Sequence, residues 1–124
     1  MGPSEVVAAF IEAINAHDAR RIAALCTADH RFVDAHGVVV AGEGLPAAWA
    51  GYFGFMPHYG IDVVELLEHG GTVAVFGQAW GGLDAADPSV RAWRRPCAWR
   101  ARVEGERVKL WQVYVDTKVV FDLL

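Results

Sequence analysis

Apolar side chains recur along the chain with two different spacings. Near the start, Val7, Phe10, Ile11 and Ile14 repeat every three or four residues, which predicts a helix with one apolar face. Ser4 precedes them and can cap the free backbone N–H groups of the first turn. The polar run that follows ends this helix.

Two further helices are expected. Asp18 is a good cap for a short second helix, in which Ile22 and Leu25 face inward. Residues 45–53 predict a third helix, because Pro46 would stand in its first turn, where its missing N–H is harmless.

Apolar and polar residues alternate through most of the remaining chain, which predicts strands. Short strands are expected at residues 31–34 and 38–41, with a turn at 34–37 between them. A long hairpin joins residues 61–68 to residues 72–80, and a second one runs from about residue 91 to residue 116 with its turn at 104–106. Residues 81–89 form a loop, and the apolar tail at 117–124 must pack on something.

The last strand has two faces of different character. Successive strand residues point to opposite sides, so one face carries Val108, Leu110, Gln112, Tyr114 and Asp116, and the other carries Lys109, Trp111, Val113 and Val115. The first face has polar groups at the end of an apolar row, which is typical of a ligand cavity. The second face is then outward, and its exposed apolar row predicts a homodimer through the outer face of the sheet.

The order of elements predicts an α+β fold, in which helices cover one face of a strongly curved antiparallel sheet. A chain of 124 residues without linkers or repeats is expected to form a single domain over residues 1–124.

Charge and composition limit the partners and the location that are expected for this protein. A net charge of −4 argues against nucleic acid as a partner, although seven of the eleven basic residues lie between Arg91 and Lys109. Those residues either pair with nearby acids, which is the favoured interpretation, or form a patch for an anionic ligand. No apolar run approaches the ~20 residues of a membrane helix, and nothing resembles a signal peptide. Cys26 and Cys97 do not make a disulfide framework, so a cytoplasmic protein with reduced thiols is expected.

Three strings carry a resemblance to a known family. They are AFIEAINAHDARRIAALCTADHRFVDAHG near the start, VVVAGEGLPAAWAGYF in the middle and GERVKLWQVYVD near the end. Together they resemble the SnoaL-like and ketosteroid-isomerase-like superfamily over essentially the whole chain. The resemblance implies a cone-shaped, nuclear transport factor two-like fold, in which the curved sheet wraps around the N-terminal helices. This fold hosts isomerases, cyclases, epoxide hydrolases, dehydratases and non-catalytic binders.

The resemblance also implies roles for individual residues. Asp34 matches the general base of ketosteroid isomerases, but Phe10 and Trp99 stand where those enzymes hold an enolate oxygen, so steroid isomerisation is not expected. Asp116 lies where limonene-epoxide hydrolases and SnoaL-type cyclases place a pocket carboxylate. Gln78 and Trp80 replace the arginine and aspartate of the hydrolases, which argues against epoxide hydrolysis.

The candidate catalytic residues are Asp34, Asp116, Tyr114 and His30. A carboxylate at the end of an apolar face loses hydration and becomes a better base, and two such groups in one cavity would divide acid and base roles. Tyr114 would orient a substrate oxygen and His30 would assist a carboxylate. The alternative is structural: Asp34 caps its turn, Asp116 is solvated, Tyr114 is a wall aromatic and His30 caps a helix.

The candidate ligand-binding residues are aromatic or lie on the expected cavity face, and core packing is the alternative for most of them. They are Phe10, Trp49, Tyr52, Phe53, Met56, Trp80, Trp99 and Gln112. The histidine spacing does not favour a metal site, and no cofactor is expected. The first candidate function is an enzyme that moves protons on a mainly apolar small molecule, such as an isomerase, cyclase or dehydratase. The second is a non-catalytic dimeric binder of such a molecule. A third is an interaction scaffold whose cavity is filled, which the bulky Trp80 and Trp99 favour.

Overall fold

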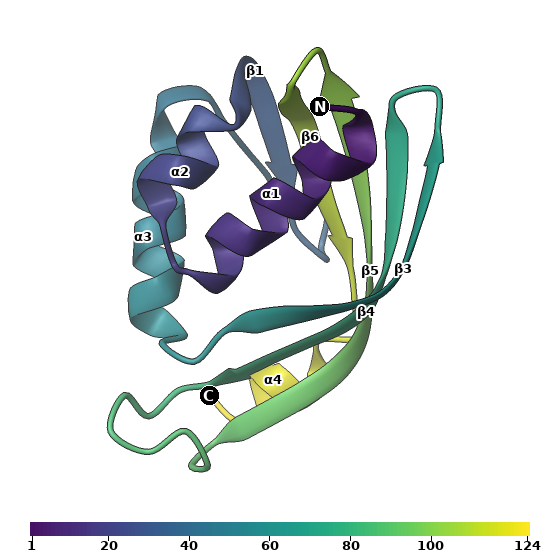
Figure 1. The fold of residues 1–124 in the computed structure, drawn as a ribbon. Coiled ribbons are helices and arrows are strands. Elements are labelled where there is room, and N and C mark those ends of the chain that lie inside the picture. Colours follow the sequence, from purple (N-terminus) through teal and green to yellow (C-terminus); the bar gives the residue numbers. More distant parts are fainter.

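The computed structural model describes residues 1–124, in which helices lie on the concave side of one curved sheet (Figure 1). The helices are α1 (Pro3–Asn15), α2 (Ala19–Ala24), α3 (Leu45–Phe55) and α4 (Lys118–Asp122), with a 3-10 turn at Gly42–Gly44 before α3. The strands are β1 (Cys26–Val33), β2 (Val39–Ala41), β3 (Gly60–His69), β4 (Thr72–Gly82), β5 (Ala92–Glu104) and β6 (Arg107–Tyr114). The predicted α+β class is confirmed.

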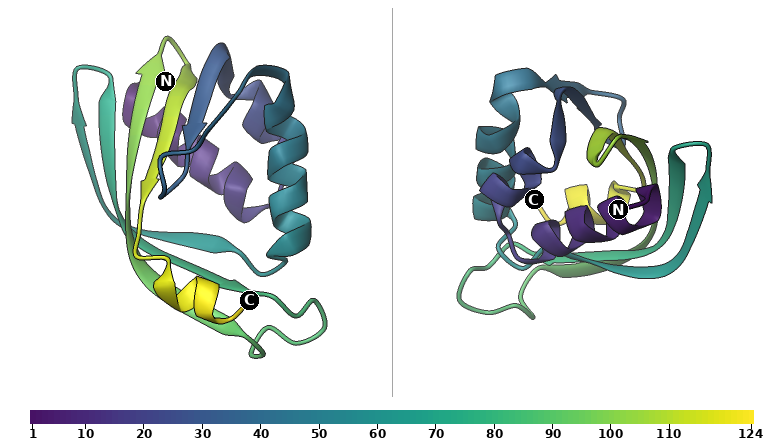
Figure 2. Two further views of the ribbon diagram at one scale, coloured as in Figure 1. Left: turned by 180° about the vertical axis from the view of Figure 1, so that it is seen from behind. Right: turned by 45° about the horizontal axis from the view of Figure 1, so that its top comes forward.

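The strands are ordered β2-β1-β6-β5-β4-β3, so the first and last strands of the chain meet in the middle of the sheet. All neighbours are antiparallel except β1 and β6, which are parallel. The long strands β3, β4 and β5 bend, and α4 lies against their lower half (Figure 2). Both α3 and α4 thus lie on the concave side of the sheet.

A bulge in β3 accompanies the bend of the long strands. The register between β3 and β4 shifts between Val63 and Glu65, and Val64 is 80% exposed. A Cβ atom on Gly77 would lie 1.9 Å from the carbonyl oxygen of Asp62, so only glycine allows the backbones to approach here. Bulges bend strands and increase their twist, which fits the curvature of this sheet.

A second bulge overturns the predicted faces of β6. Val103 pairs with Val108 while Arg102 pairs with Leu110, so Lys109 is an extra residue in the strand. Val108 and Trp111 are both buried, at 0% and 1% exposure, although unbroken alternation would place them on opposite faces. The prediction of the inner face was wrong from residue 109 onward, because one inserted residue exchanges the two faces of everything after it.

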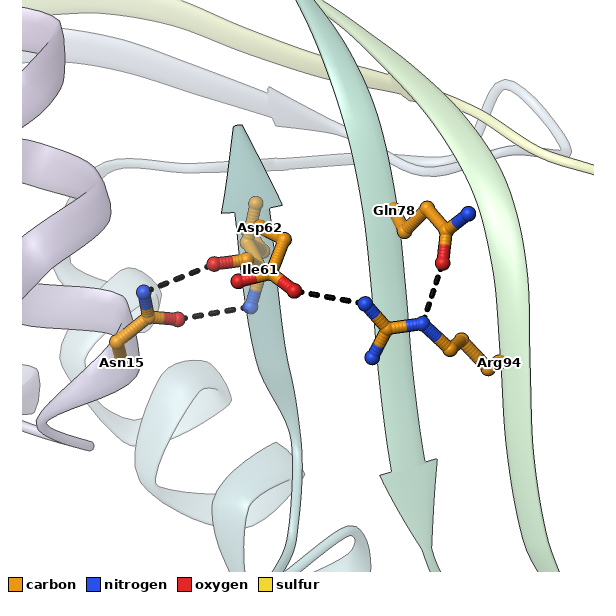
Figure 3. A network of polar contacts seen from close by, with 5 residues as sticks. All are labelled: Asn15, Ile61, Asp62, Gln78 and Arg94. Atoms are coloured by element: carbon orange, nitrogen blue, oxygen red, sulfur yellow. Dashed lines mark hydrogen bonds and ion pairs between the residues drawn. The ribbon is translucent and has the colours of Figure 1, made fainter. Parts of the chain in front are cut away.

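The core forms where α1 lies across the concave face. Its inward residues include Phe10, whose ring lies 5.0 Å from that of Trp111, and Trp111 in turn stacks on Trp99 at 6.1 Å. At its end, Asn15 makes paired hydrogen bonds with the backbone of Ile61, donating at 3.0 Å and accepting at 2.8 Å (Figure 3). These bonds fix α1 against β3.

The shorter elements agree with the sequence-based predictions only in part. Asp18 accepts a hydrogen bond from the Arg21 backbone and caps α2, as predicted. The tail at residues 117–124 forms α4, for which the sequence predicted only packing, and β1 begins at Cys26 rather than at residue 31. No helix has the length and apolar character needed to cross a bilayer.

Candidate functional site

The concave side of the sheet holds a cavity of about 360 Å³. Its wall is formed by α3, the end of β1, the inner faces of β4 to β6 and the tail with α4, and 20 of its 23 residues are hydrophobic. A larger, more open groove of about 670 Å³ runs past His17, Trp80 and Arg94 at the end of α1. The enclosed cavity is the better candidate, because sites for small molecules are concave, mostly apolar and typically roughly 300–1,000 Å³ in size.

Tryptophans supply much of the cavity wall. Trp49 comes from α3, Trp93 and Trp99 from β5, and Trp111 from β6. All four are at most 9% exposed. Gly81 on β4 makes room for Trp93, because a Cβ atom there would lie 2.7 Å from the indole ring. Large aromatic side chains therefore make up much of this apolar wall.

Asp34 is the only carboxylate on the cavity wall. It follows β1 directly, and its Oδ1 atom accepts hydrogen bonds from the backbone N–H groups of His36 and Val38, at 2.8 and 2.9 Å. These bonds hold the tight turn between β1 and β2, as the structural interpretation of Asp34 requires. They also fix the carboxylate and leave Oδ2 without a hydrogen-bond partner in the chain.

Next to Asp34, the tail closes part of the cavity. The Thr117 hydroxyl lies 3.2 Å from Nε2 of His36, and the ring of Phe121 meets the His36 ring edge-on at 5.5 Å. Arg91 donates from two guanidinium nitrogens to the carbonyl oxygen of Leu123. The tail thus contacts the β1–β2 turn and the start of β5.

The wall also carries three side chains with ionisable groups, which are Tyr52, Tyr59 and Cys97. The rings of Tyr52 and Tyr59 meet edge to face with centroids 5.0 Å apart. Burial raises the pKa of both tyrosines, and a negative charge on Cys97 would raise each pKa further. Burial also raises the pKa of the Cys97 thiol to about 11. All three groups are therefore protonated at neutral pH.

The structure places five of the twelve predicted site residues on the cavity wall. They are Asp34, Trp49, Tyr52, Met56 and Trp99. Phe10 and Phe53 are buried beside the cavity: Phe10 packs on Trp111, and Phe53 stacks on His17 at 4.2 Å.

His30 lies in the core rather than on the cavity wall. Its ring is 0% exposed, and Nδ1 lies 2.7 Å from the carbonyl oxygen of Val108. Since a carbonyl only accepts, Nδ1 carries the proton in the neutral ring. Nε2 is buried without a partner, and desolvation lowers the pKa of the imidazole. The predicted assistance to a carboxylate has no geometric basis.

The remaining four predicted residues point away from the cavity, which corrects their expected placement. Tyr114 and Gln112 lie on the outer face because of the bulge at Lys109, and Tyr114 is 50% exposed. Trp80 also lies outside, with the Arg94 guanidinium 5.2 Å from its ring centre. Asp116 is exposed and accepts a hydrogen bond from the Lys118 backbone at 3.0 Å.

Sequence reasoning missed several parts of the wall. Trp111, Val113 and Val115 were assigned to the outer face, and Trp93 was given no role. The available signal for Trp93 was its spacing from Cys97 and Trp99 on one face of β5. Nothing local identified residues 117–124 as cavity wall, since an apolar tail can pack anywhere.

The basic residues of β5 also divide between the two faces. On the outer face, Arg94 pairs with Asp62 at 2.7 Å and donates to Gln78 (Figure 3). Arg95 shares the inner face with Trp93 and Cys97, and its Nε atom is buried without a hydrogen-bond partner. No three potential metal ligands cluster anywhere in the structure.

A curved sheet that holds helices and an apolar cavity on its concave side defines a nuclear transport factor two-like and cystatin-like α+β domain. The chain belongs to the SnoaL-like domain family, whose sequence model matches residues 7–111.

Solved structures share this fold at low identity. A putative SnoaL-like polyketide cyclase from Jannaschia superposes with a TM-score of 0.83 at 19% identity, covering 98% of this chain and 90% of the other. IdmH, a putative polyketide cyclase from Streptomyces antibioticus, gives 0.80 at 20% identity, covering 99% and 98%. A hypothetical protein of ketosteroid isomerase-like fold from Catenulispora acidiphila, in complex with trimethylamine, gives 0.81 at 21% identity, covering 96% and 91%. No curated protein matches the sequence.

Proposed function

We propose that the protein is a cofactor-independent enzyme that transfers a proton on a mainly apolar small molecule bound in the cavity, as an isomerase, cyclase or dehydratase does. The observation that carries the proposal is Asp34, the single carboxylate on a mainly apolar wall. Its turn holds Oδ1 in place and leaves Oδ2 for a substrate proton. A positioned general base contributes roughly 10²–10⁴-fold to a rate.

The proposal can be tested without the natural substrate. The ketone 2-tetralone is small enough for the cavity, and removal of a proton next to its carbonyl is the elementary step shared by enolising isomerases and cyclases. In D₂O the base removes this proton, an enolate forms, and a deuteron returns to the same carbon. Mass spectrometry then measures the rate of deuterium incorporation above the buffer rate.

Asp34→Asn should lower the protein-catalysed exchange rate by about 100-fold or more, because the amide cannot accept the proton. Asp116→Asn is the matched control, since Asp116 lies outside the cavity, and it should leave the rate unchanged. Two results would refute the proposal that Asp34 transfers the proton. In the first, the ketone binds but exchange in wild type stays at the buffer rate. In the second, Asp34→Asn exchanges deuterium as fast as wild type.

The second candidate function is a non-catalytic binder of an apolar molecule. The hydrogen bonds of Asp34 favour it, because they explain this carboxylate by its turn alone. Exchange at the buffer rate together with tight binding of the ketone would select this alternative.

We also propose a homodimer through the outer sheet face, although with other residues than those predicted. Phe76, Ala98 and Tyr114 are direct neighbours across three strands on this face, and Phe76 and Tyr114 are 42% and 50% exposed. An exposed apolar row of this kind suits a self-complementary contact. Light scattering should give a dimer for wild type and a monomer for Phe76→Glu; a monomeric wild type would contradict the proposal.

A further inference from the structure

The tail at residues 117–124 is the least firmly attached part of the cavity wall. No residue of the tail is buried, and its helix α4 has five residues, too few to be stable alone in water. All backbone hydrogen bonds of the tail lie within it, such as those that the Phe121 and Leu124 N–H groups donate. Four of its side chains nevertheless line the cavity, those of Thr117, Val120, Phe121 and Leu124.

The other walls of the cavity are built more firmly. Strands β4, β5 and β6 are joined by continuous antiparallel pairing, and α3 buries Leu45, Trp49 and Phe53. Movement of either wall would break strand pairing or expose core residues, whereas movement of the tail does neither. Figure 2 shows α4 and the C-terminus at the lower end of the curved sheet, apart from α1 and α2. Because local opening occurs where few buried contacts oppose it, the tail is the wall that opens at the lowest free-energy cost.

Two exposed side chains outside the tail hold it closed. Arg91 donates from two guanidinium nitrogens to the Leu123 carbonyl oxygen. His36 contacts both the Thr117 hydroxyl, at 3.2 Å from Nε2, and the edge of the Phe121 ring. Arg91 stands directly before β5 with a φ of 52°, in the left-handed region that few residues other than glycine adopt. Backbone conformations of this kind concentrate at ligand clamps and switch regions.

We propose that the tail is a lid, which opens about residues 115–117 to admit an apolar molecule and then closes over it, with Arg91 as the latch. This inference goes beyond the proposed function and rests on it only for the molecule that enters. Closure also affects the chemistry, because the His36 backbone N–H donates to Oδ1 of Asp34 at 2.8 Å. The lid thus closes onto the turn that holds the carboxylate, and it separates the cavity from bulk water during proton transfer.

Hydrogen exchange measured by NMR tests the opening in the protein without ligand. The amides of Phe121, Leu123 and Leu124 should exchange at least about tenfold faster than amides paired between β5 and β6. Low concentrations of urea should leave these tail rates nearly unchanged, because lid opening exposes little surface. Arg91→Met keeps an apolar stem and removes both donors, so it should speed exchange of the tail amides about three- to tenfold.

Binding kinetics test whether the opening admits the ligand. Stopped-flow mixing with 2-tetralone follows quenching of the cavity tryptophans. The latch is formed in both the empty and the occupied closed states, and it is broken only while the ligand passes. Arg91→Met should therefore raise the association and dissociation rate constants by the same factor, about three- to tenfold, and change the dissociation constant by less than about twofold.

Two further variants complete the design. Thr117→Val removes the hydroxyl that contacts His36 and keeps the shape of the side chain, so it should raise both rate constants about two- to fivefold. Arg100→Met is the matched control, because Arg100 is an exposed arginine of the same strand that pairs with Gln112 on the outer face. It should leave the binding rates and the exchange of the tail amides unchanged.

The possible failures are distinct. If 2-tetralone does not bind to wild type, cavity binding is wrong, and the proposed function and the lid fall together. If the ketone binds but Arg91→Met and Thr117→Val leave both rate constants unchanged, the lid is refuted while cavity binding stands. A weaker dissociation constant with an unchanged association rate would make the tail a fixed wall. Exchange of the tail amides at the rate and urea dependence of the β5–β6 amides would also refute the lid. Binding without deuterium exchange in D₂O would overturn only the proton transfer.

Discussion

His30 should make the stability of the protein depend on pH in a way that a single substitution removes. The ring is fully buried, Nδ1 donates to the Val108 carbonyl oxygen at 2.7 Å, and Nε2 has no partner to stabilise a second proton. Desolvation lowers the pKa of this imidazole, and it outweighs the opposing effects of the hydrogen bond to Val108 and the charge of Asp29.

The sign of the effect follows from proton linkage. In the unfolded chain the imidazole titrates near pH ~6.5, whereas the folded ring binds its proton only at lower pH. Above that range both states are neutral, and His30 contributes no pH dependence. As the pH falls below about 6.5, the unfolded state gains a proton first, so stability falls with acidification. One proton gives a slope of at most about 1.4 kcal/mol per pH unit, until the folded ring also protonates.

His30→Asn keeps an N–H donor near the Val108 carbonyl oxygen and removes the titration. Free energies of unfolding are measured with urea between pH 7.5 and 5 for wild type and the variant. The smaller side chain lowers the stability of the variant, by about 1–3 kcal/mol where both proteins are neutral. Below pH 6.5 the difference should shrink, because only wild type loses the contribution of His30.

His69→Asn serves as the control, since His69 is exposed at the end of β3. Its stability should follow wild type in parallel at every pH. Acidic groups elsewhere affect all three proteins alike and cancel in the differences. Parallel curves for His30→Asn and wild type across this range would refute the reasoning.

Three further substitutions test the fold. Trp111→Ala should lower the free energy of unfolding, measured by urea titration, by about 3–5 kcal/mol. Leu110 is its neighbour on the outer face, and Leu110→Ala should lower it by less than about 1 kcal/mol. Equal losses would contradict the bulge in β6. Asn15→Ala should cost about 1–3 kcal/mol and speed hydrogen exchange at the Ile61 amide, because that amide loses its acceptor; unchanged exchange would argue against the paired bonds. Gly77→Ala should cost at least about 2 kcal/mol in thermal unfolding, since its Cβ would overlap the neighbouring strand, and a neutral result would exclude the close approach.

Local patterns were sufficient for the elements of this fold. The apolar spacing of α1, the aspartate cap of α2 and the proline at the start of α3 each depend on neighbours in sequence, and each was interpreted correctly. The long hairpin of β3 and β4 was likewise predicted to within two residues at each end. These features need no knowledge of the rest of the chain.

The candidate site was predicted less well, because it depends on register. One extra residue at Lys109 exchanged the faces of the last strand, which moved Tyr114 and Gln112 outside and brought Val113 and Val115 inside. A bulge has no reliable local signature here, since the alternation on both sides of it looks regular. Asp34 was placed correctly because it directly follows β1 and does not depend on that register.

By itself, the sequence determined the helices, most strand positions, the α+β class and a turn aspartate at the end of β1. Only the tertiary structure decided which residues face the cavity, because that depends on the β6 bulge and on the parallel pairing of β1 with β6. It also brought the tail, the end of α3 and the inner face of β5 to one enclosed space. The spacing of apolar residues shows which residues share a face of one helix or strand. A cavity, in contrast, is formed by side chains from five or more elements that lie far apart in sequence.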